Sequence, residues 1–350
     1  MAEAAPPRFF TESDADLQVL DGHRVAVLGY GTLGRSVALN LRDSGICVLV
    51  GNIADGYRDQ AAADGFTPLD LGDAAARADE VLVLLPDEVI PGCFDREIAP
   101  RIRPGAAVCF ASGYVLAYKL VTPPPGVDVL LIAPRMSGAL VRQTYLEHEG
   151  FYSCVSVEAD ASGQAHARLL ALAAAVGSLR RGAFVLPAAK EALLDLLIEQ
   201  TFGVYLGVGV QLAFRIGVEA GLPAEAMVLE LYMSGEMSRT IEAFASEGFY
   251  GSLLNHGLTA LYGGFIRTAD VDQQSMERMF RATMDDIRSG GFAQRFQREL
   301  ADGYPTLKAI REIIGGGDPI SQAEKRVRAG LDGADSRKVA DSSEVTDSSE

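Results

Sequence analysis

The sequence predicts an α/β fold, with a doubly wound parallel sheet, followed by an all-helical domain. Between Arg24 and about Arg180, short apolar runs alternate with segments of helical length, as in right-handed βαβ crossovers. The runs read as buried parallel strands: RVAVLGY, ICVLVGN, EVLVLLP, AAVCFAS and VDVLLIAP. From about Pro187 the pattern changes to long periodic helices without a convincing strand. One or two largely buried helices are expected first, ended by Gly221 and Pro223.

These patterns divide the chain into four segments. We predict an N-terminal extension (1–22), a dinucleotide-binding α/β domain (23–186), a helical metal- and substrate-binding domain (187–315) and a polar tail (316–350). The tail ends DSRKVADSSEVTDSSE, which can bury little apolar surface, and is therefore expected to be disordered.

Composition excludes several function classes. The 350 residues carry a formal net charge of −16, which disfavours nucleic acid and anionic membranes as partners. The first residues lack the features of a signal peptide, and no apolar run approaches the roughly 18 residues of a membrane span. The four cysteines lack CxxC or zinc-type spacing, which favours free buried thiols in a reducing compartment. We therefore expect a cytoplasmic protein.

A glycine-rich turn predicts a cofactor. The segment HRVAVLGYGTLGRSVALNLRDSG contains a strand, the turn GYGTLG and a helix in that order, and a second strand, ICVLVGN, follows directly, as a βαβ unit requires. Gly29 permits the turn, Gly31 lets the backbone approach a diphosphate, and Gly34 lets the helix pack on the strand. Helix N–H groups then meet the diphosphate charge. This is the pattern of a Rossmann domain that binds a nicotinamide dinucleotide, although a turn without a ligand remains the alternative.

The loop after the second strand, GNIADGYRD, bears on the choice of cofactor. The carboxylate of Asp55 suits the ribose hydroxyls of NAD and repels a 2′-phosphate, whereas Arg58 could pair with that phosphate. NAD is therefore favoured over NADP, and the alternative is that both side chains are surface charges. The candidate cofactor-binding residues are Gly29, Tyr30, Gly31, Thr32, Leu33, Gly34, Asn52, Asp55, Leu85 and Pro86.

Acidic residues in the helical domain predict a metal site. In KEALLDLLIEQ, Asp195 and Glu199 lie four residues apart and share a helix face among leucine and isoleucine. Embedded carboxylates need a cation, and Mg²⁺ prefers oxygen ligands of this kind. The alternative is one solvated carboxylate and one paired with Arg or Lys. Glu230 is a third candidate carboxylate on a later helix, with Ser234 and Glu236 near it in sequence.

Together these motifs resemble ketol-acid reductoisomerase, a Mg²⁺-dependent enzyme of branched-chain amino acid synthesis. The resemblance runs from Arg24 to about Glu312. It depends on GYGTLG, NLRDSG, VLLPDEV, PPPGVDVLLIAPR, KEALLDLLIEQ, VEAGLPAE and SGGFAQRFQRELADGYPTLKAIRE. It implies that the helical domain is the family's knotted domain and that the chain is of the shorter class, whose site is completed across a homodimer. It also implies that Asp195 and Glu199 bind Mg²⁺ and that Glu230 is a further acidic site residue.

At several positions this sequence differs from the pattern of the family that it resembles. The family's histidine after the AAVCFAS strand is replaced by Ser112, and its lysine after the next strand by Arg135. A fourth acidic position falls on Ser234, and SLLNHGLTALYGG replaces a substrate-binding serine segment. In the family an alkyl group migrates and hydride reduces the new ketone. Ser112 is not basic at neutral pH and Arg135 cannot donate a proton, so proton handling must differ. We take Asp195, Glu199, Glu230, Ser112 and Arg135 as candidate catalytic residues.

Three interpretations remain. The first is a divergent reductoisomerase-type enzyme of specialised metabolism, dependent on NAD and Mg²⁺. It acts on a small hydroxy or oxo acid or a diol, and it resembles the branch that closes a cyclopropanol ring. The second is an ordinary reductoisomerase of branched-chain amino acid synthesis. The third is an inactive NAD-binding regulatory homologue, which the intact glycine turn and carboxylate pair disfavour.

Overall fold

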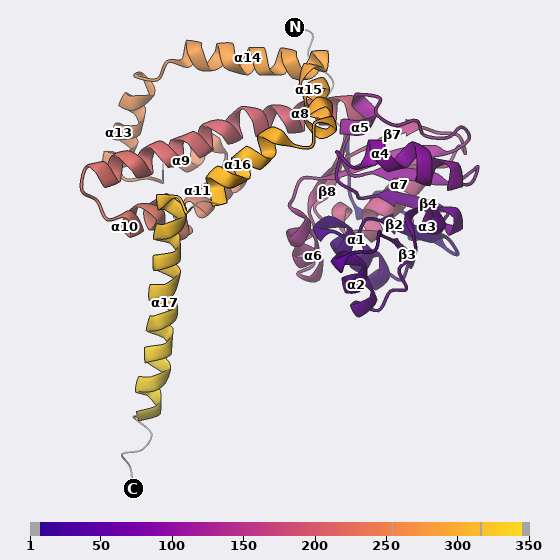
Figure 1. Ribbon diagram of the computed structural model, residues 1–350, viewed down its shortest axis with the longest axis horizontal. Coiled ribbons are helices and arrows are strands. Elements are labelled where there is room, and N and C mark those ends of the chain that lie inside the picture. The colour runs from indigo at the N-terminus through magenta and orange to yellow at the C-terminus, as the bar shows by residue number, and fades with distance from the viewer. Residues whose placement is uncertain (1–7, 254, 316, 345–350) are drawn as a thin grey trace. The chain divides into compact units, whose positions relative to one another are not determined.

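The computed structural model describes residues 8–253, 255–315 and 317–344. Residues 1–7 of the predicted extension, Leu254 of SLLNHGLTALYGG, and residues 316 and 345–350 of the predicted tail lie outside the described residues. The chain divides into two compact units, Met1–Leu196 and Leu197–Glu350. Each unit is described by itself, and many of its elements are labelled in Figure 1.

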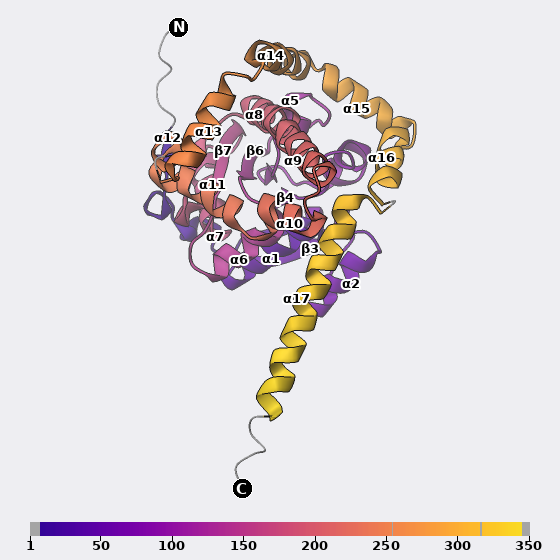
Figure 2. The ribbon, with the colours of Figure 1, turned by 90° about the vertical axis from the view of Figure 1, so that its left-hand side faces the viewer.

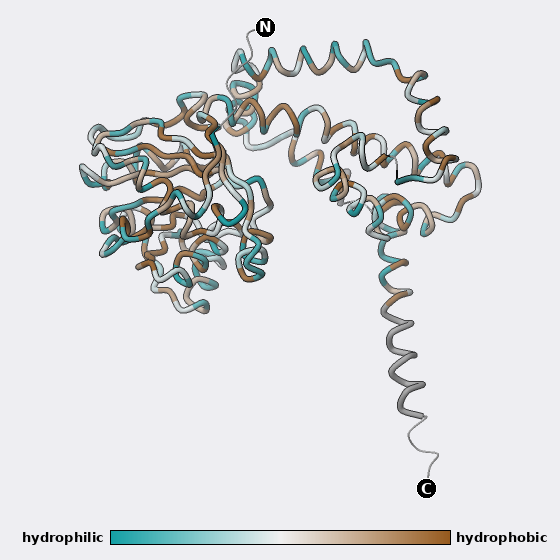
Figure 3. The backbone as a smooth tube through the Cα atoms, turned by 180° about the vertical axis from the view of Figure 1, so that it is seen from behind, coloured by the Kyte–Doolittle hydropathy of each residue, from teal (hydrophilic) through white to brown (hydrophobic). Residues whose placement is uncertain are grey.

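The first unit contains an eight-stranded mixed sheet in the order β1-β8-β7-β6-β5-β4-β2-β3. The five strands expected from the sequence form its parallel part, in the order β3-β2-β4-β5-β6. The strands are β1 (Phe9–Phe10), β2 (Arg24–Leu28), β3 (Cys47–Gly51), β4 (Glu80–Val83), β5 (Ala107–Phe110), β6 (Asp128–Pro134), β7 (Tyr152–Ala159) and β8 (Gly182–Val185). Their central segments are mostly apolar, as the colouring of Figure 3 shows. The predicted doubly wound α/β fold is confirmed, extended by β7, which pairs antiparallel with β6, and by β8 and β1.

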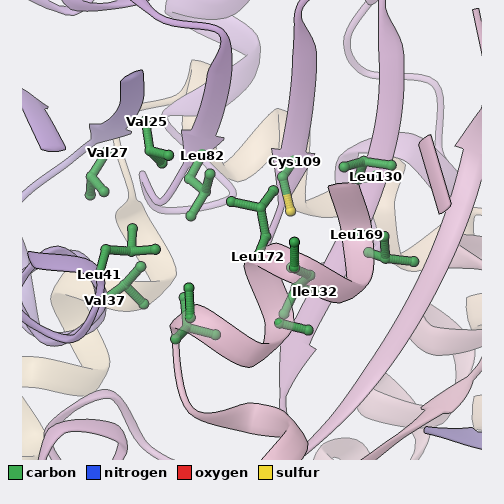
Figure 4. Close-up of a cluster of buried hydrophobic side chains, with 14 of the residues drawn as sticks. Val25, Val27, Val37, Leu41, Leu82, Cys109, Leu130, Ile132, Leu169 and Leu172 are labelled. Carbon is green, nitrogen blue, oxygen red and sulfur yellow. The ribbon is translucent and has the colours of Figure 1, made fainter. Parts of the chain in front are cut away.

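Helices lie between these strands, and a last helix follows β8 into the second unit. They are α1 (Thr32–Asp43), α2 (Gly56–Ala63), α3 (Leu71–Arg77), α4 (Ile90–Cys93), α5 (Tyr114–Ala117), α6 (Gly138–Leu146), α7 (Ala165–Ala175) and, after β8, α8 (Ala188–Gln200). Helix α1 begins at the glycine turn and ends at Asp43, just before Gly45, whose φ of +83° is unfavourable for other residues. It turns Val37 and Leu41 toward the sheet, where α7 contributes Leu169 and Leu172 (Figure 4). Burial of this apolar surface is the main stabilising contribution in the unit.

The described part of the second unit contains helices and no strand. Its helices are α9 (Phe202–Glu219), α10 (Ala224–Val228), α11 (Glu236–Glu247), α12 (Phe249–Leu253), α13 (Leu258–Thr268), α14 (Gln273–Ser289), α15 (Gly291–Ala301), α16 (Pro305–Gly315) and α17 (Pro319–Glu344). Gly221, with φ +91°, and Pro223 follow the end of α9, as predicted. The segment AEAMVLELYMSGEMSRTIEAFASEG does not form one continuous helix, because a π-helical turn, Leu229–Met233, and Gly235, with φ +80°, interrupt it.

Two features of this unit differ from expectation. Within the segment expected to be a disordered tail, the first turns of α17 pack against α10 and bury Ala323 and Val327 with Phe214 and Val228 (Figure 2). The prediction averaged over a polar composition and did not weigh these apolar residues, which are spaced four apart.

The helices around Gly203 are also not largely buried. Of the residues of α9, Phe214 and Gly217 are buried, whereas several large apolar side chains are exposed: Phe202, Val204, Leu206, Val208, Leu212, Ile216 and Val218. Within the described residues, Ala188–Glu219 is the one helical stretch long and apolar enough to cross a membrane by length and composition. It also carries the charged residues of α8, which a membrane interior disfavours.

The cysteines are free thiols in the structure. Cys93, Cys109 and Cys154 are buried, as expected, and Cys47 is exposed. Cys47 departs from the expectation because it begins β3, which lies at the edge of the sheet.

Candidate active site

The glycine turn joins β2 to α1, and its backbone lies very close to the first turn of α1. A Cβ at Gly34 would lie 1.9 Å from the carbonyl oxygen of Gly29, so only glycine lets the first turn of α1 pack on the turn. Gly31 precedes α1 and has no heavy atom within 4 Å of where its Cβ would be. This open space at the start of a helix, where backbone N–H groups are unpaired, suits a diphosphate.

A cleft of about 770 Å³ opens beside this turn. Four of the predicted cofactor residues line it, namely Tyr30, Gly31, Thr32 and Asp55. The other lining residues come from α1, α2 and α6: Arg35, Ser36, Leu39, Gly56, Tyr57, Gln60, Ala139, Arg142, Gln143 and Leu146. The cleft is large enough for part of a dinucleotide.

Asp55 and Asn52 are held together in the loop after β3. Asn52 is buried; its Oδ1 accepts from the Tyr30 N–H at 2.9 Å, and its Nδ2 donates to Asp55 Oδ1 at 2.7 Å. Asp55 is the N-cap of α2, and its Oδ1 also accepts from the N–H groups of Tyr57 and Arg58. The loop therefore fixes the carboxylate at the wall of the cleft.

Arg58 does not line this cleft. Its guanidinium donates to the backbone oxygens of Asn52 and Pro68 and binds Asp70 Oδ1 at 2.7 Å. These bonds tie Arg58, in the first turn of α2, to the segments before and after that helix.

The two arginines that do line the cleft are bound to carboxylates of the protein. Arg35 Nε donates to Asp64 Oδ2 at 2.6 Å, and Arg35 Nη2 donates to Asp64 Oδ1 at 3.0 Å. Arg142 donates to Asn40 Oδ1 at 2.9 Å and pairs with Asp43. The charge of each guanidinium is therefore largely neutralised by a neighbouring carboxylate of the protein.

A second cavity of about 190 Å³ lies at the carboxyl ends of β4 and β5. Leu33 and Leu85, two more predicted cofactor residues, line it, together with Asp87 and Ser112. Ligands in doubly wound folds bind beyond the carboxyl ends of the strands, so this position is suitable for the reacting end of a cofactor. Gly29, Gly34 and Pro86 line neither cavity; Gly29 instead packs against Leu84.

Ser112 and Asp87 form a hydrogen-bonded pair in this cavity. The Ser112 hydroxyl donates to Asp87 Oδ2 at 2.9 Å, and Ser112 Oγ accepts from the Tyr114 N–H at 3.2 Å. Burial, together with the nearby carboxylates of Glu191, Glu88 and Asp195, raises the pKa of Asp87 to about 6 against the lowering effect of the Ser112 hydrogen bond. A carboxyl group with this pKa exchanges a proton near neutral pH.

Arg135 binds two carboxylates of α8. It follows β6, and its guanidinium donates to Asp195 Oδ1 at 2.8 Å and pairs with Glu191. Glu191 is 1% exposed and its Oε2 accepts from the Gly113 N–H at 2.7 Å. Burial raises the pKa of Glu191, opposed by Gly113 and Arg135. We call Arg135, Glu191 and Asp195 the Arg135 cluster.

The predicted acidic residues are brought together only in part. Asp195 and Glu199 lie one turn apart on α8, and the Asp195 side chain is 44% exposed and paired with Arg135. Glu230 belongs to the second unit, where it is exposed in the π-helical turn. Among the residues that the structure describes, no group of three His, Cys, Asp or Glu side chains could hold a metal ion.

Sequence reasoning missed Glu191 and Asp87. Glu191 lies four residues before Asp195, so the spacing that selected Asp195 and Glu199 extends one turn further back. Asp87 follows β4 in VLLPDEV, and a polar residue just beyond the carboxyl end of a parallel strand is a recognised signal for a site.

Comparison with known families assigns both parts of the chain. The family model "Acetohydroxy acid isomeroreductase, NADPH-binding domain" matches residues 19–182. The model "Ketol-acid reductoisomerase, C-terminal domain" matches residues 189–332.

Individual relatives agree with this assignment. The chain is 37% identical to a ketol-acid reductoisomerase (NADP(+)) of Pyrobaculum arsenaticum, over 88% of this chain and 94% of the relative. It is also 37% identical to a ketol-acid reductoisomerase (NAD(P)(+)) of Metallosphaera sedula, over 87% and 92%. Among solved structures, an NADH-preferring ketol-acid reductoisomerase from an uncultured archaeon matches with a TM-score of 0.87 and 30% identity, covering 92% of this chain and 98% of that one.

Proposed function

Because the chain belongs to the ketol-acid reductoisomerase family, we propose that it catalyses the family's isomeroreductase reaction on a small acetohydroxy acid. The chain is an NAD(P)-dependent oxidoreductase of the reductoisomerase type. The main support for the substrate is that polar groups of the second cavity and of the Arg135 cluster lie next to each other at the carboxyl edge of the sheet. Ser112 lines the second cavity, and the adjacent Gly113 binds Glu191 of the Arg135 cluster. When bound, the nicotinamide supplies hydride and Mg²⁺ polarises the substrate carbonyl.

The test is turnover of 2-acetolactate with Mg²⁺ and NADH or NADPH, followed by cofactor absorbance and by identification of the dihydroxy acid product. Turnover of roughly 1–10 s⁻¹, an ordinary enzymatic rate, supports the isomeroreductase reaction. Cofactor oxidation without the rearranged product contradicts it.

Ser112 and the Arg135 cluster favour a second candidate, a specialised reaction without alkyl migration. Arg135 is bound to both Glu191 and Asp195, and a serine replaces the family's histidine, so the site lacks a basic imidazole. The substrate is then another small hydroxy or oxo acid or a diol, and closure of a cyclopropanol ring remains within this candidate. NAD⁺-dependent oxidation of 2,3-diol acids, together with no turnover of acetolactate, supports this candidate over the first.

We propose NAD(H) as the preferred cofactor. The Asp55 carboxylate stands at the wall of the cleft, where it suits ribose hydroxyls and repels a 2′-phosphate. Arg58 is bound to Asn52 and Asp70 outside the cleft, and Arg35 and Arg142 are bound to Asp64 and Asp43. Fluorescence titration with both reduced cofactors tests this preference. Tighter binding of NADPH contradicts it and indicates that an arginine exchanges its carboxylate for the phosphate.

We propose that Asp195 and Glu199 hold Mg²⁺. Their oxygens are the ligands that this ion prefers, and one or two carboxylates suffice because Mg²⁺ keeps several waters. Asp195 Oδ1 binds Arg135, so Arg135 competes with the ion for this carboxylate. Calorimetric titration of the protein with MgCl₂ tests the site, and heat of binding that Asp195→Asn leaves unchanged contradicts it.

We propose a homodimer that covers α9, in the cytoplasm. Helix α9 exposes apolar side chains on several faces, including Phe202 (55%), Leu206 (52%) and Ile216 (57%). A helix that is apolar all round is normally buried, and exposed apolar surface of this extent marks an interface. Light scattering after size exclusion, without detergent, tests the dimer. A monomer contradicts it, and a requirement for detergent indicates that α9 binds a membrane instead.

A further inference from the structure

The second cavity contains a carboxyl group and a hydroxyl group that are connected to each other. We propose that Asp87 and Ser112 form the proton-transfer pair for ketone reduction, with Asp87 as the proton source and the Ser112 hydroxyl as the group that meets the substrate oxygen. This inference rests on the proposed function, because it assigns a role within the reduction step.

The hydrogen bonds around Ser112 allow two states of the pair. With Asp87 ionised, the Ser112 hydroxyl donates to Asp87 Oδ2, as the structure has it. With Asp87 protonated, the carboxyl donates to Ser112 Oγ, which also accepts from the Tyr114 N–H. Both lone pairs of Oγ are then occupied, and the hydroxyl proton is available to a ligand in the cavity. Protonation of Asp87 therefore converts Ser112 into a donor for the substrate.

The surroundings keep the proton on Asp87 at moderately low pH. The charged groups around Asp87 are its neighbour Glu88 and, on α8, Glu191 and Asp195, whose charge Arg135 partly balances. Burial has the largest effect, and with these carboxylates it raises the pKa of Asp87 to about 6. Asp87 is therefore protonated below that pH and can regain a proton from solvent near neutral pH.

With a bound reduced nicotinamide as the source of hydride, the ketone carbon would gain the hydride and the carbonyl π bond would break toward oxygen. Ser112 donates its proton to that oxygen and takes a proton from Asp87. The products are an alcohol, the oxidised nicotinamide and the Asp87 carboxylate, which solvent reprotonates. In the reverse direction the Asp87 carboxylate accepts the proton through Ser112.

The experiment compares wild type, Asp87→Asn, Ser112→Ala and the double variant. Glu88→Gln is the matched control, since it removes a neighbouring carboxylate without touching Ser112. The assay substrates are 2-acetolactate and the rearranged acid 3-hydroxy-3-methyl-2-oxobutanoate, which needs reduction alone. We expect Asp87→Asn to lower kcat for reduction by roughly 10²–10⁴-fold, the usual range for a lost acid catalyst. We expect the double variant to be little worse than Asp87→Asn, because the two groups act together.

Two further readouts separate proton transfer from a structural role. In wild type, kcat for reduction should fall as pH rises through about 6. In Glu88→Gln the same fall should begin at a lower pH, because one carboxylate that raises the pKa of Asp87 is gone, and in Asp87→Asn the dependence should be absent. Infrared difference spectra of the cofactor-free protein should show a carboxylic acid band that disappears over the same pH range, and Asp87→Asn should lack this band.

The outcomes are distinguishable. An Asp87→Asn variant that keeps the wild-type rate and pH profile overturns the pair and leaves the proposed function intact. If the wild type reduces neither acid, the proposed function fails, and the pair loses its role with it. A wild type that reduces only the rearranged acid, with the predicted loss in Asp87→Asn, supports the pair and contradicts the isomeroreductase reaction.

Discussion

Gly113→Ala tests whether the close approach of α8 to the end of β5 builds the active site. Gly113 has φ −75° and ψ −9°, which alanine adopts without strain. The added Cβ, however, would lie 2.2 Å from the carbonyl oxygen of Ala188 and 2.7 Å from Glu191 Oε2. The start of α8 must therefore move by roughly 1 Å or more to restore ordinary contact distances.

The magnitude follows from two effects. Overpacking of a tight contact costs about 1–3 kcal/mol, and weakening the hydrogen bond from the Gly113 N–H to the buried Glu191 carboxylate costs about 1.5–3 kcal/mol. The two effects share one displacement, so we expect a total of about 2–5 kcal/mol. For a unit of this size, that corresponds to a Tm lower by roughly 5–15 °C.

Activity should fall as well, because Glu191 positions Arg135, which binds Asp195. A displacement of this size at reacting groups costs on the order of 10²-fold in rate. Scanning calorimetry and cofactor oxidation assays measure the two effects.

Gly92→Ala is the matched control. No heavy atom lies within 4 Å of where its Cβ would be, so its Tm and activity should stay close to wild type. If Gly113→Ala behaves like Gly92→Ala, the contact between Gly113 and α8 does not constrain the site, and the reasoning is refuted.

Three other predictions follow from the same structure. Asp195→Asn should lower Mg²⁺-dependent activity by at least roughly 10²-fold and Glu199→Gln should behave alike, whereas full activity of either variant in EDTA excludes the metal site. Ser112→His combined with Arg135→Lys should raise 2-acetolactate turnover if loss of the histidine and lysine limits alkyl migration; an unchanged rate assigns the limitation elsewhere, such as to residues 252–264. Burial raises the pKa of Glu80 from 4.5 to about 7 against the lowering effects of Arg168 and His23, so its stabilising contribution is complete below pH 4.5 and is lost as pH rises through 7. Glu80→Gln should therefore raise Tm relative to wild type more at pH 8 than at pH 5, and equal differences at both pH values contradict this.

The sequence by itself determined the α/β domain, because each strand and turn leaves a local pattern. The five parallel strands are continuous apolar runs, and GYGTLG has glycine at Gly34, where a Cβ would lie 1.9 Å from a backbone oxygen. The family was also readable, since its motifs are short and follow one another in order. Strands β7 and β8 left weaker signals: serines interrupt the apolar residues of SCVSV in β7, and β8 has four residues.

The tertiary structure decided the partners of the charged side chains. Arg135 and Glu191 are 56 residues apart in sequence, and no local pattern shows that they bind each other or that Asp195 joins them. The same holds for Asp87 and Ser112, which meet because parallel strands end at one edge of the sheet. The role of Arg58 was ambiguous in the sequence, and the structure shows that it binds Asn52, Pro68 and Asp70 rather than lining the cleft. Local patterns record backbone preferences and burial, whereas pairing between distant charges depends on chain topology, which only the folded chain specifies.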